Sequence, residues 1–410
     1  MTADFHAHPL LGKERINSLD LLRGFALLGI LLMNIQVFAM PGSAYMNPST
    51  YGDLQGINYW VWAITHVLVD QKFISLFSIL FGAGVCVFTE RAEHSSGGAL
   101  GLHYRRMFWL LLFGLIHAHF IWYGDILVSY ALCGFLVFWF RRLSVRALLI
   151  WSAVFFLIPV LYNGLTQLAM SEIPEQAKAG MLQSWAPSAD KIQAEINAYT
   201  GSWVEQQAQR HKSALMLETL VFAIYFFWRG MSMMLLGMAL YRMGALSGEC
   251  SASFYNRLIV IGAIVGLGLS SWGVQWNFEH QWSLEHSMFG GSLFNYIGSI
   301  ALTLAYLGLL MRAYQLGWIT ALQQRLMAVG RMAFSNYIAQ SILCTFVFYG
   351  FGLGLFGSFE RWQQLLVVLG VWLILLIWSP IWLKRYQFGP LEWLWRALSY
   401  WQMPPLRRSS

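Results

Sequence analysis

The sequence predicts an all-α, polytopic membrane protein, a transmembrane helix bundle of about ten spans with both termini in the cytoplasm. Charged residues make up 11% of the 410 residues and hydrophobic residues 58%, whereas an ordinary soluble domain has roughly 25% charged residues. Apolar runs long enough to cross about 30 Å of hydrocarbon recur along the chain. Most of the 26 Lys and Arg residues fall in alternate connecting segments, which is typical of cytoplasmic loops.

The composition also excludes other classes of protein. Abundant aromatic residues and the lack of a short repeat rule out a disordered chain, a collagen and a coiled coil. The net charge of +7 follows from the topology, so no nucleic-acid partner is expected. The four cysteines have no CxxC spacing, and we expect neither a disulfide nor a metal site, nor a bound cofactor. The first 18 residues are polar and lack the pattern of a cleaved signal peptide.

Ten apolar runs are predicted to cross the membrane. In chain order they are residues 19–40, 72–90, 107–123, 125–140, 146–169, 219–241, 257–276, 290–311, 331–352 and 363–383. The third and fourth runs are separated only by a short turn, so they should form a tight helical hairpin. Arg229 interrupts the sixth run, which is either one continuous helix or a helix broken near Gly230.

These runs divide the chain into five parts. They are a cytoplasmic N-terminal segment (1–18), a transmembrane half (19–170), an extracytoplasmic segment (171–213), a second transmembrane half (214–385) and a cytoplasmic interfacial tail (386–410). The segment 171–213 has the spacing of one or two amphipathic helices on the outer surface. It either caps an outward-facing cavity or is a solvated connector. Trp393 and Trp395 place the tail at headgroup level.

Ionisable residues inside spans are candidates for function, because each costs roughly 2.5 to 3.5 kcal/mol to insert. In the first span, Asp20 and Arg23 are three residues apart on one helical face, and Asn34 projects from nearly the same face further out. The charged pair either locks helix packing or binds a ligand. Asn34 either bonds to a neighbouring helix or holds a substrate.

A second polar group precedes the second span. His66 and Asp70 stand at i and i+4, followed closely by Lys72. An imidazole beside a carboxylate is suited to act as a general base. The alternative is an interfacial amphipathic helix with a snorkelling lysine.

The strongest signal is the segment GLIHAHFIWYGDIL. His117 and His119 are about 200° apart around a helix, so they cannot both face one cavity. Asp125 can approach His117 but not His119, and helical geometry disfavours a zinc site at the HxH pair. We predict His117 as the reacting residue.

Two later spans also carry polar groups. The guanidinium of Arg229 must meet a carboxylate, a phosphate or a carbonyl. Asn336 and Gln340 form a polar stripe with Arg331 at its mouth, which either binds a ligand or makes interhelical hydrogen bonds. With Arg105, these inner cations are suited to phosphates, whereas the outer acid and base groups are suited to an uncharged acceptor.

Five segments carry a family resemblance: RINSLDLLRGFALLGILLMN, DQKFISLFSILFGAG, GLIHAHFIWYGDILVSYALCG, VGRMAFSNYIAQS and FGPLEWLWR. In this order they resemble the motifs of the YeiB family of bacterial inner-membrane proteins. The SLDxLRG opening is similar to a broader transmembrane acyltransferase superfamily, which includes heparan-alpha-glucosaminide N-acetyltransferase. The resemblance implies transfer of an acyl group from a cytoplasmic donor such as acetyl-CoA to a hydroxyl or amine of an extracytoplasmic glycan or small molecule.

The resemblance also bears on the reacting histidine. The glucosaminide enzymes carry theirs in the loop after the first span, where this sequence has none. His117 is therefore preferred, with Asp125 as the orienting carboxylate. The predicted catalytic residues are His117, Asp125, Asn34, His66 and Asp70, and the predicted substrate- or donor-binding residues are Asp20, Arg23, Lys72, Arg229, Arg331, Asn336 and Gln340.

Two other functions fit the same residues. The intramembrane Asp, His and Arg side chains could form the pathway of a small-solute transporter. Alternatively, they only pack, in a non-catalytic membrane partner protein. Membrane lipids are expected partners in each case, and the sequence leaves homodimerisation open.

Overall fold

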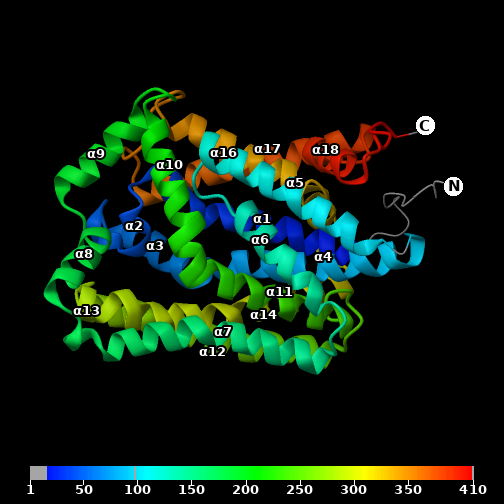
Figure 1. The fold of residues 1–410 in the computed structure, drawn as a ribbon, viewed down its shortest axis with the longest axis horizontal. Helices are drawn as coiled ribbons and strands as arrows, with labels where there is room; N and C mark the ends of the chain where they lie inside the picture. Colours follow the sequence, from blue (N-terminus) through cyan, green and yellow to red (C-terminus); the bar gives the residue numbers. More distant parts are fainter. Residues whose placement is uncertain (1–15, 97, 409–410) are drawn as a thin grey trace.

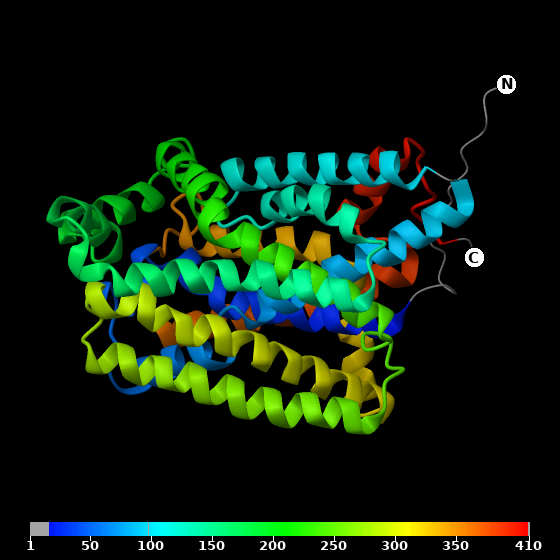
Figure 2. The same ribbon diagram turned by 60° about the horizontal axis from the view of Figure 1, so that its bottom comes forward.

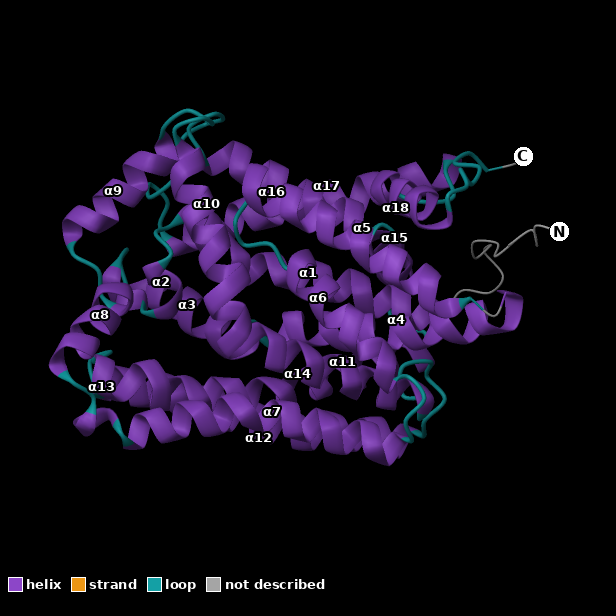
Figure 3. Ribbon diagram, viewed as in Figure 1, coloured by secondary structure: helices purple, strands orange, loops and turns teal. Residues whose placement is uncertain are grey.

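The computed structural model describes residues 16–96 and 98–408, and these residues fold into helices joined by loops (Figure 3). Outside the helices, the described residues make one isolated antiparallel bridge, between Tyr386 and Arg407. Most of the predicted N-terminal segment, residues 1–15, lies outside the described residues.

The helices form a bundle whose long members run along a common axis, with the start of α1 and the end of α18 at the same end (Figures 1 and 2). The N-terminal helices are α1 (Asn17–Ala39), α2 (Ser43–Met46), α3 (Gly56–Leu68), α4 (Lys72–Ser96), α5 (Ala99–Phe120), α6 (Leu127–Val137) and α7 (Val145–Leu168). The middle helices are α8 (Glu175–Trp185), α9 (Ala189–Thr200), α10 (Gln206–Met216), the π-helical η5 (Leu217–Phe226) and α11 (Phe227–Arg242). The C-terminal helices are α12 (Ala252–Glu279), α13 (Leu284–His286), α14 (Ser292–Gln315), α15 (Thr320–Arg331), α16 (Ala333–Phe348), α17 (Arg361–Arg385) and α18 (Pro390–Tyr400).

Seven helical segments of the described chain are long and apolar enough to cross a membrane. They are Asn17–Ala39, Gly56–Glu93, Val145–Leu168, Gln206–Arg242, Ala252–Glu279, Leu284–Gln315 and Arg361–Arg385. Two shorter apolar helical segments are Leu127–Phe140 and Ala333–Phe348. The protein is therefore a multi-pass helical membrane protein, as the composition predicts.

Three predicted spans differ from the structure. The third, 107–123, falls on α5, which is not among the described helical segments that are long and apolar enough to cross a membrane. The sixth is one continuous helical segment through Gly230, with a π-helical part before Phe227, so the expected alternative of a break at Gly230 is wrong. The ninth run begins at a boundary between two helices, because α15 ends at Arg331 and α16 begins at Ala333. The polar residues of α15 kept that helix out of the hydropathy prediction.

Close packing of α1 against α15 depends on two glycines. A Cβ atom at Gly24 would overlap the backbone oxygen of Leu326, and a Cβ at Gly330 would overlap the backbone oxygen of Asp20. Small residues let helix backbones approach in this way. The contact brings the charged start of α1 next to the junction of α15 and α16.

The segment after α7 covers the end of the bundle opposite the start of α1 (Figure 1). It contains two helices, α8 and α9, before α10 begins. The Glu195 carboxylate on α9 accepts a hydrogen bond from the Gly42 backbone N–H at 3.1 Å, and burial raises the pKa of this carboxyl group. Tyr199, also on α9, packs on Tyr349 with ring centroids 4.9 Å apart. These contacts hold α9 against the ends of α1 and α16.

Candidate functional site

A cavity of about 890 Å³ lies near the end of the bundle where α1 begins. Its walls come from α1, α4, α5, α6, α15, α16 and α18. The charged residues that line it are Asp20, Arg23, Glu90, Arg91, Arg106, Arg331, Glu392 and Arg396. Five arginines therefore outnumber three carboxylates, and the cavity suits an anionic ligand.

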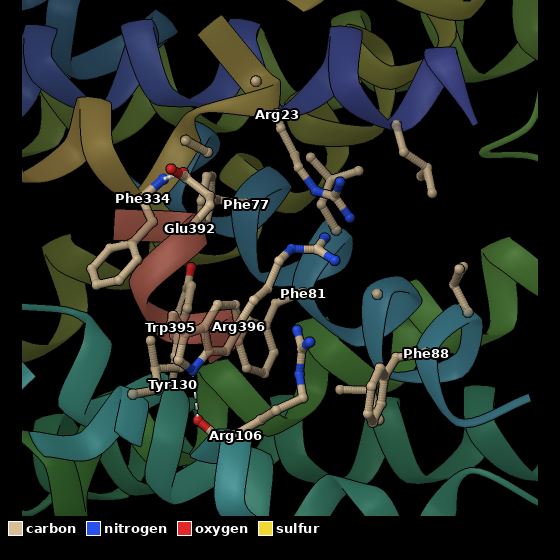
Figure 4. Close-up of a pocket in the computed structure, with 18 of the residues that line it drawn as sticks. Arg23, Phe77, Phe81, Phe88, Arg106, Tyr130, Phe334, Glu392, Trp395 and Arg396 are labelled. Atoms are coloured by element: carbon tan, nitrogen blue, oxygen red, sulfur yellow. Dashed lines mark hydrogen bonds between the residues drawn. The ribbon is translucent and has the colours of Figure 1, made fainter. Parts of the chain in front are cut away.

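The arginines reach the cavity from different helices. Figure 4 shows the side chains of Arg23, Arg106 and Arg396 converging on one space. Arg23 also pairs with Asp20, with 3.1 Å between Nη1 and Oδ1. The Arg106 guanidinium lies 4.4 Å from the ring centroid of Phe88 and 4.2 Å from that of Trp395. These aromatic contacts hold the Arg106 cation in place.

The last helix is anchored beside the cavity by hydrogen bonds to α5 and α16. Trp395 Nε1 donates to the Arg106 backbone oxygen at 2.9 Å. The Glu392 carboxylate accepts from the backbone N–H groups of Phe334 and Ser335 at 2.7 and 3.1 Å, at the first turn of α16. An acidic side chain there satisfies free N–H groups and complements the helix dipole. The tail, predicted as an interfacial helix, thus supplies a wall of the cavity.

The deeper part of the cavity is largely apolar and aromatic. Its lining there includes Phe77, Phe81, Ile126, Tyr130 and Tyr337. The Tyr130 hydroxyl lies 2.8 Å from Ser78 Oγ. One cavity therefore combines a cationic part with an apolar part, which suits a ligand that has an anionic head and an uncharged arm.

His117 and Asp125, which the sequence paired, meet close to this deeper part. His117 Nδ1 lies 2.7 Å from Asp125 Oδ2, and each side chain is 1% exposed. The other oxygen, Oδ1, accepts from the Val128 backbone N–H at 2.8 Å. Gly114 leaves the necessary space, because a Cβ there would lie 2.6 Å from the Val128 nitrogen. The turn between α5 and α6 thus brings the carboxylate back to the imidazole.

The bond to Asp125 defines the chemistry of the imidazole. A carboxylate at Nδ1 favours the tautomer with its proton on that nitrogen, which leaves a lone pair on Nε2. His117 Nε2 is buried and has no hydrogen-bond partner among the described residues. A buried nitrogen of this kind is available as a proton acceptor.

Tyr337 connects the dyad to the cavity. Its ring packs on the imidazole with centroids 5.1 Å apart, and its hydroxyl accepts from the Ile126 backbone N–H at 3.2 Å. Tyr337 lines the cavity, whereas His117 and Asp125 do not. The dyad therefore lies behind this tyrosine.

His66, Asp70 and Lys72 lie in a separate buried network, and Arg229 is bonded nearby to Ser75 and Ser299. The Asp70 carboxylate accepts from Tyr45 at 2.7 Å and from Asn295 at 2.8 Å, and lies 3.4 Å from His66 Nδ1. Lys72 Nζ donates to Asn295 Oδ1 and to the His66 backbone oxygen. None of these residues lines the large cavity.

Of the remaining predicted residues, some line the large cavity and others do not. Asp20, Arg23 and Arg331 line the cavity. Asn336 and Gln340 do not: the Asn336 amide bonds to Val329 and Ser379, and the Gln340 amide bonds to the Leu27 backbone oxygen. These contacts are of the interhelical kind.

Three other predicted positions lie outside the cavity. Asn34 does not line it, and the Arg105 guanidinium lies over Trp401. His119 points away from His117, as the helical angle predicts, and contacts His211 and Glu218. Within the described chain, no group of three His, Cys, Asp or Glu side chains is arranged to hold a metal ion.

Sequence reasoning missed Arg106, Tyr337, Glu392, Trp395 and Arg396. All but Arg106 lie in two of the segments that carry the family resemblance, VGRMAFSNYIAQS and FGPLEWLWR. Their position in these segments was the sequence feature that could have identified them as candidate functional residues.

Comparison with known proteins identifies the family. Residues 240–402 match the family described as protein of unknown function, DUF418. The chain is 33% identical to the uncharacterized protein YeiB of Escherichia coli (strain K12) over 398 residues, which cover 94% of this chain and 96% of YeiB. It is 32% identical to the uncharacterized protein YxaH of Bacillus subtilis (strain 168), with 98% of each chain covered. The chain belongs to the DUF418 family.

The predicted membership of the YeiB family is thereby confirmed. This DUF418 protein is also similar, at 27% identity with 96% of each chain covered, to an uncharacterized 39.9 kDa protein in the amylase 3′ region of Bacillus acidopullulyticus. The region of this chain that matches the family, 240–402, includes α15, α16 and all of α18, which border the cavity. The dyad lies before that region, in the part covered by the full-length relatives.

Proposed function

We propose that this DUF418 protein is an integral-membrane acyltransferase that moves an acyl group, such as acetyl, from a coenzyme A thioester to a hydroxyl or amine of an extracytoplasmic glycan or small molecule. One observation carries the proposal. A buried His117–Asp125 dyad with an unpartnered Nε2 packs on Tyr337, which lines a cavity rich in arginine.

The cavity has the chemistry that an acyl-CoA requires. Coenzyme A has several phosphate charges at one end and a long uncharged arm at the other. Arg23, Arg106 and Arg396 are suited to the phosphates, because guanidinium groups bind phosphate oxygens in pairs. Phe77, Phe81 and Tyr130 are suited to the arm, which would carry the thioester toward Tyr337.

The reaction needs one base and no redox partner. The acceptor oxygen or nitrogen forms a bond to the thioester carbonyl carbon while His117 Nε2 takes its proton. The carbon–sulfur bond then breaks, and the imidazolium returns the proton to the thiolate of coenzyme A. Asp125 stabilises the imidazolium and keeps its orientation. We assign the Tyr337 hydroxyl to the developing oxyanion.

The proposal includes a location and an orientation. Acyl-CoA is a cytoplasmic metabolite, so the cavity must open to the cytoplasm. The concentration of Lys and Arg in alternate loops favours the same orientation, with about ten spans and both termini inside. In a bacterium the membrane concerned is the inner membrane.

The test is a binding and transfer assay with labelled acetyl-CoA. The protein, purified in nanodiscs, should bind the donor and transfer the label to membrane glycans or small amines. His117→Ala should abolish transfer and keep donor binding, whereas the control His119→Ala should keep both. Absence of donor binding, together with proton-coupled flux in liposomes, would overturn the proposal in favour of a transporter. Full transfer by His117→Ala would refute the assigned base alone.

A further inference from the structure

A second, much smaller cavity lies next to the large one. It has a volume of about 20 Å³, which is sufficient for one water-sized particle. Ile126 and Tyr130 line both cavities. Besides Tyr130, the side chains with polar atoms that line the small one are Ser75, Ser78, Ser129, Cys133, Tyr225 and Arg229.

The Arg229 side chain in this wall is a buried cation with neutral partners. Arg229 is 4% exposed. Its guanidinium donates to the Tyr296 backbone oxygen at 3.2 Å and to the hydroxyls of Ser75 and Ser299 at 2.8 and 2.6 Å. No carboxylate of the described residues lies within ion-pair distance of it. An uncompensated buried charge is costly, so the site favours a counter-ion.

The nearby network does not supply that counter-ion. Asp70 is the carboxylate of the network, and it is held by Tyr45 and Asn295. Asn295 also accepts from the Lys72 ammonium, so the charges of Asp70 and Lys72 offset each other. The positive charge of Arg229 is therefore left without a counter-charge from this network.

Two hydrogen-bond donors at the small cavity are unused. Arg229 Nε is buried and has no hydrogen-bond partner among the described residues. Ser129, 7% exposed, lines the same cavity, and its hydroxyl makes no bond to the described part of the chain. Two free donors beside an unbalanced cation are complementary to an acceptor that carries one negative charge.

We propose that this small cavity binds a single small monovalent anion of the chloride class, held by Arg229 and Ser129. The anion would neutralise the buried arginine next to Tyr130, in the wall of the large cavity. The site is independent of the acyl-transfer proposal, because no group assigned to that reaction binds the anion.

The experiment measures thermal unfolding and ³⁶Cl⁻ binding of the protein in nanodiscs. Chloride is exchanged for gluconate at constant ionic strength. For the wild type, we expect the melting temperature to rise with chloride until it saturates, bromide to replace chloride, and one chloride to bind per chain. Arg229→Gln should remove this dependence.

A second variant keeps the test decisive if Arg229→Gln does not fold. Ser129→Ala should raise the half-saturating chloride concentration by about tenfold, the effect of one hydrogen bond to a charged group. The matched control is Ser18→Ala, which removes a buried hydroxyl that donates to the Leu246 backbone oxygen at 2.7 Å. Identical melting temperatures of the wild type in chloride and gluconate, or equal half-saturation for the two serine variants, would overturn the proposal.

Discussion

The ring of Tyr337 packs on the imidazole of His117, with centroids 5.1 Å apart and planes inclined by 58°. Tyr337 lines the large cavity and His117 does not, so the tyrosine ring is the contact between the cavity wall and the imidazole. In the proposed mechanism, Tyr337 therefore lies between the donor site and the proposed base.

Tyr337→Phe should lower kcat for acyl transfer by about 100-fold, the cost of removing one oxyanion donor. The phenyl ring keeps the packing on His117, so the Kd for acetyl-CoA should stay within about twofold. Single-turnover transfer and equilibrium donor binding measure the two quantities. An unchanged kcat would remove the hydroxyl from the proposed mechanism.

Arg23→Gln should weaken acetyl-CoA binding by about tenfold, since a hydrogen bond from a charged group contributes roughly 1.5 to 3 kcal/mol. The affinity of the Arg23→Gln variant for acetyl-CoA should also depend less on salt concentration than the affinity of the wild type. The control is Arg141→Gln, which removes an arginine that pairs with Glu93 at 3.1 Å outside the cavity. Equal loss of affinity in both variants would mean that the effect is general electrostatics.

Glu392 gives a prediction about pH. Burial raises the pKa of this carboxyl group in the folded protein. The unfolded chain therefore ionises first as pH rises, and wild-type stability should fall between the ordinary pKa of glutamate and the raised value. The Glu392→Gln variant has no ionisable group at this position, so it should not lose stability in this way as pH rises.

Thermal unfolding of Glu392→Gln and the wild type across that pH range tests this prediction. The melting temperature of the variant should increase relative to that of the wild type as pH rises through this range. Above the range, the difference between the two should stay constant. Glu175→Gln, at the surface of α8, is the control. A difference that stays constant with pH would contradict the prediction.

Gly330→Ala should destabilise the protein by about 1 to 3 kcal/mol, because the new methyl group overlaps the Asp20 backbone oxygen. Gly268→Ala is the matched control, since its Cβ would meet nothing within 4 Å. That exchange should add about 0.4 to 1 kcal/mol of stability. Thermal unfolding in nanodiscs measures both, and equal effects would refute the close contact of α1 with α15.

A reporter fused after Ser410 should report the cytoplasm. The positive-inside distribution of Lys and Arg is the physical reason. Paired fusions with a cytoplasmic and a periplasmic reporter check it. A periplasmic signal would reverse the orientation and place the arginine-lined cavity outside.

Local spacing explains what could be predicted from the sequence. The composition was sufficient for the helical membrane class. The proximity of Asp20 to Arg23, and of His117 to Asp125, follows from one helical turn and one short loop. Both pairs are close in the chain, so no long-range packing was needed to infer them.

The rest depends on contacts between distant helices. α15 contains Gln323, Gln324 and Arg325, which hid it from a search for apolar runs, and its position depends on the glycines that contact α1. The Asn336 amide donates a hydrogen bond to Ser379 Oγ on α17. No local sequence pattern indicates this partner. Trp395 and Arg396 were assigned to an interface because spacing does not show which face of α18 packs inward.

The cavity takes walls from α1 and from α18, the first and the last helices of the described chain. During synthesis every other wall therefore leaves the ribosome before Trp395 and Arg396 do. A chain that stops short of α18 lacks Trp395, which contacts Arg106, and Arg396, which lines the cavity. The arginine-lined cavity is thus complete only after the last described helix has been synthesised.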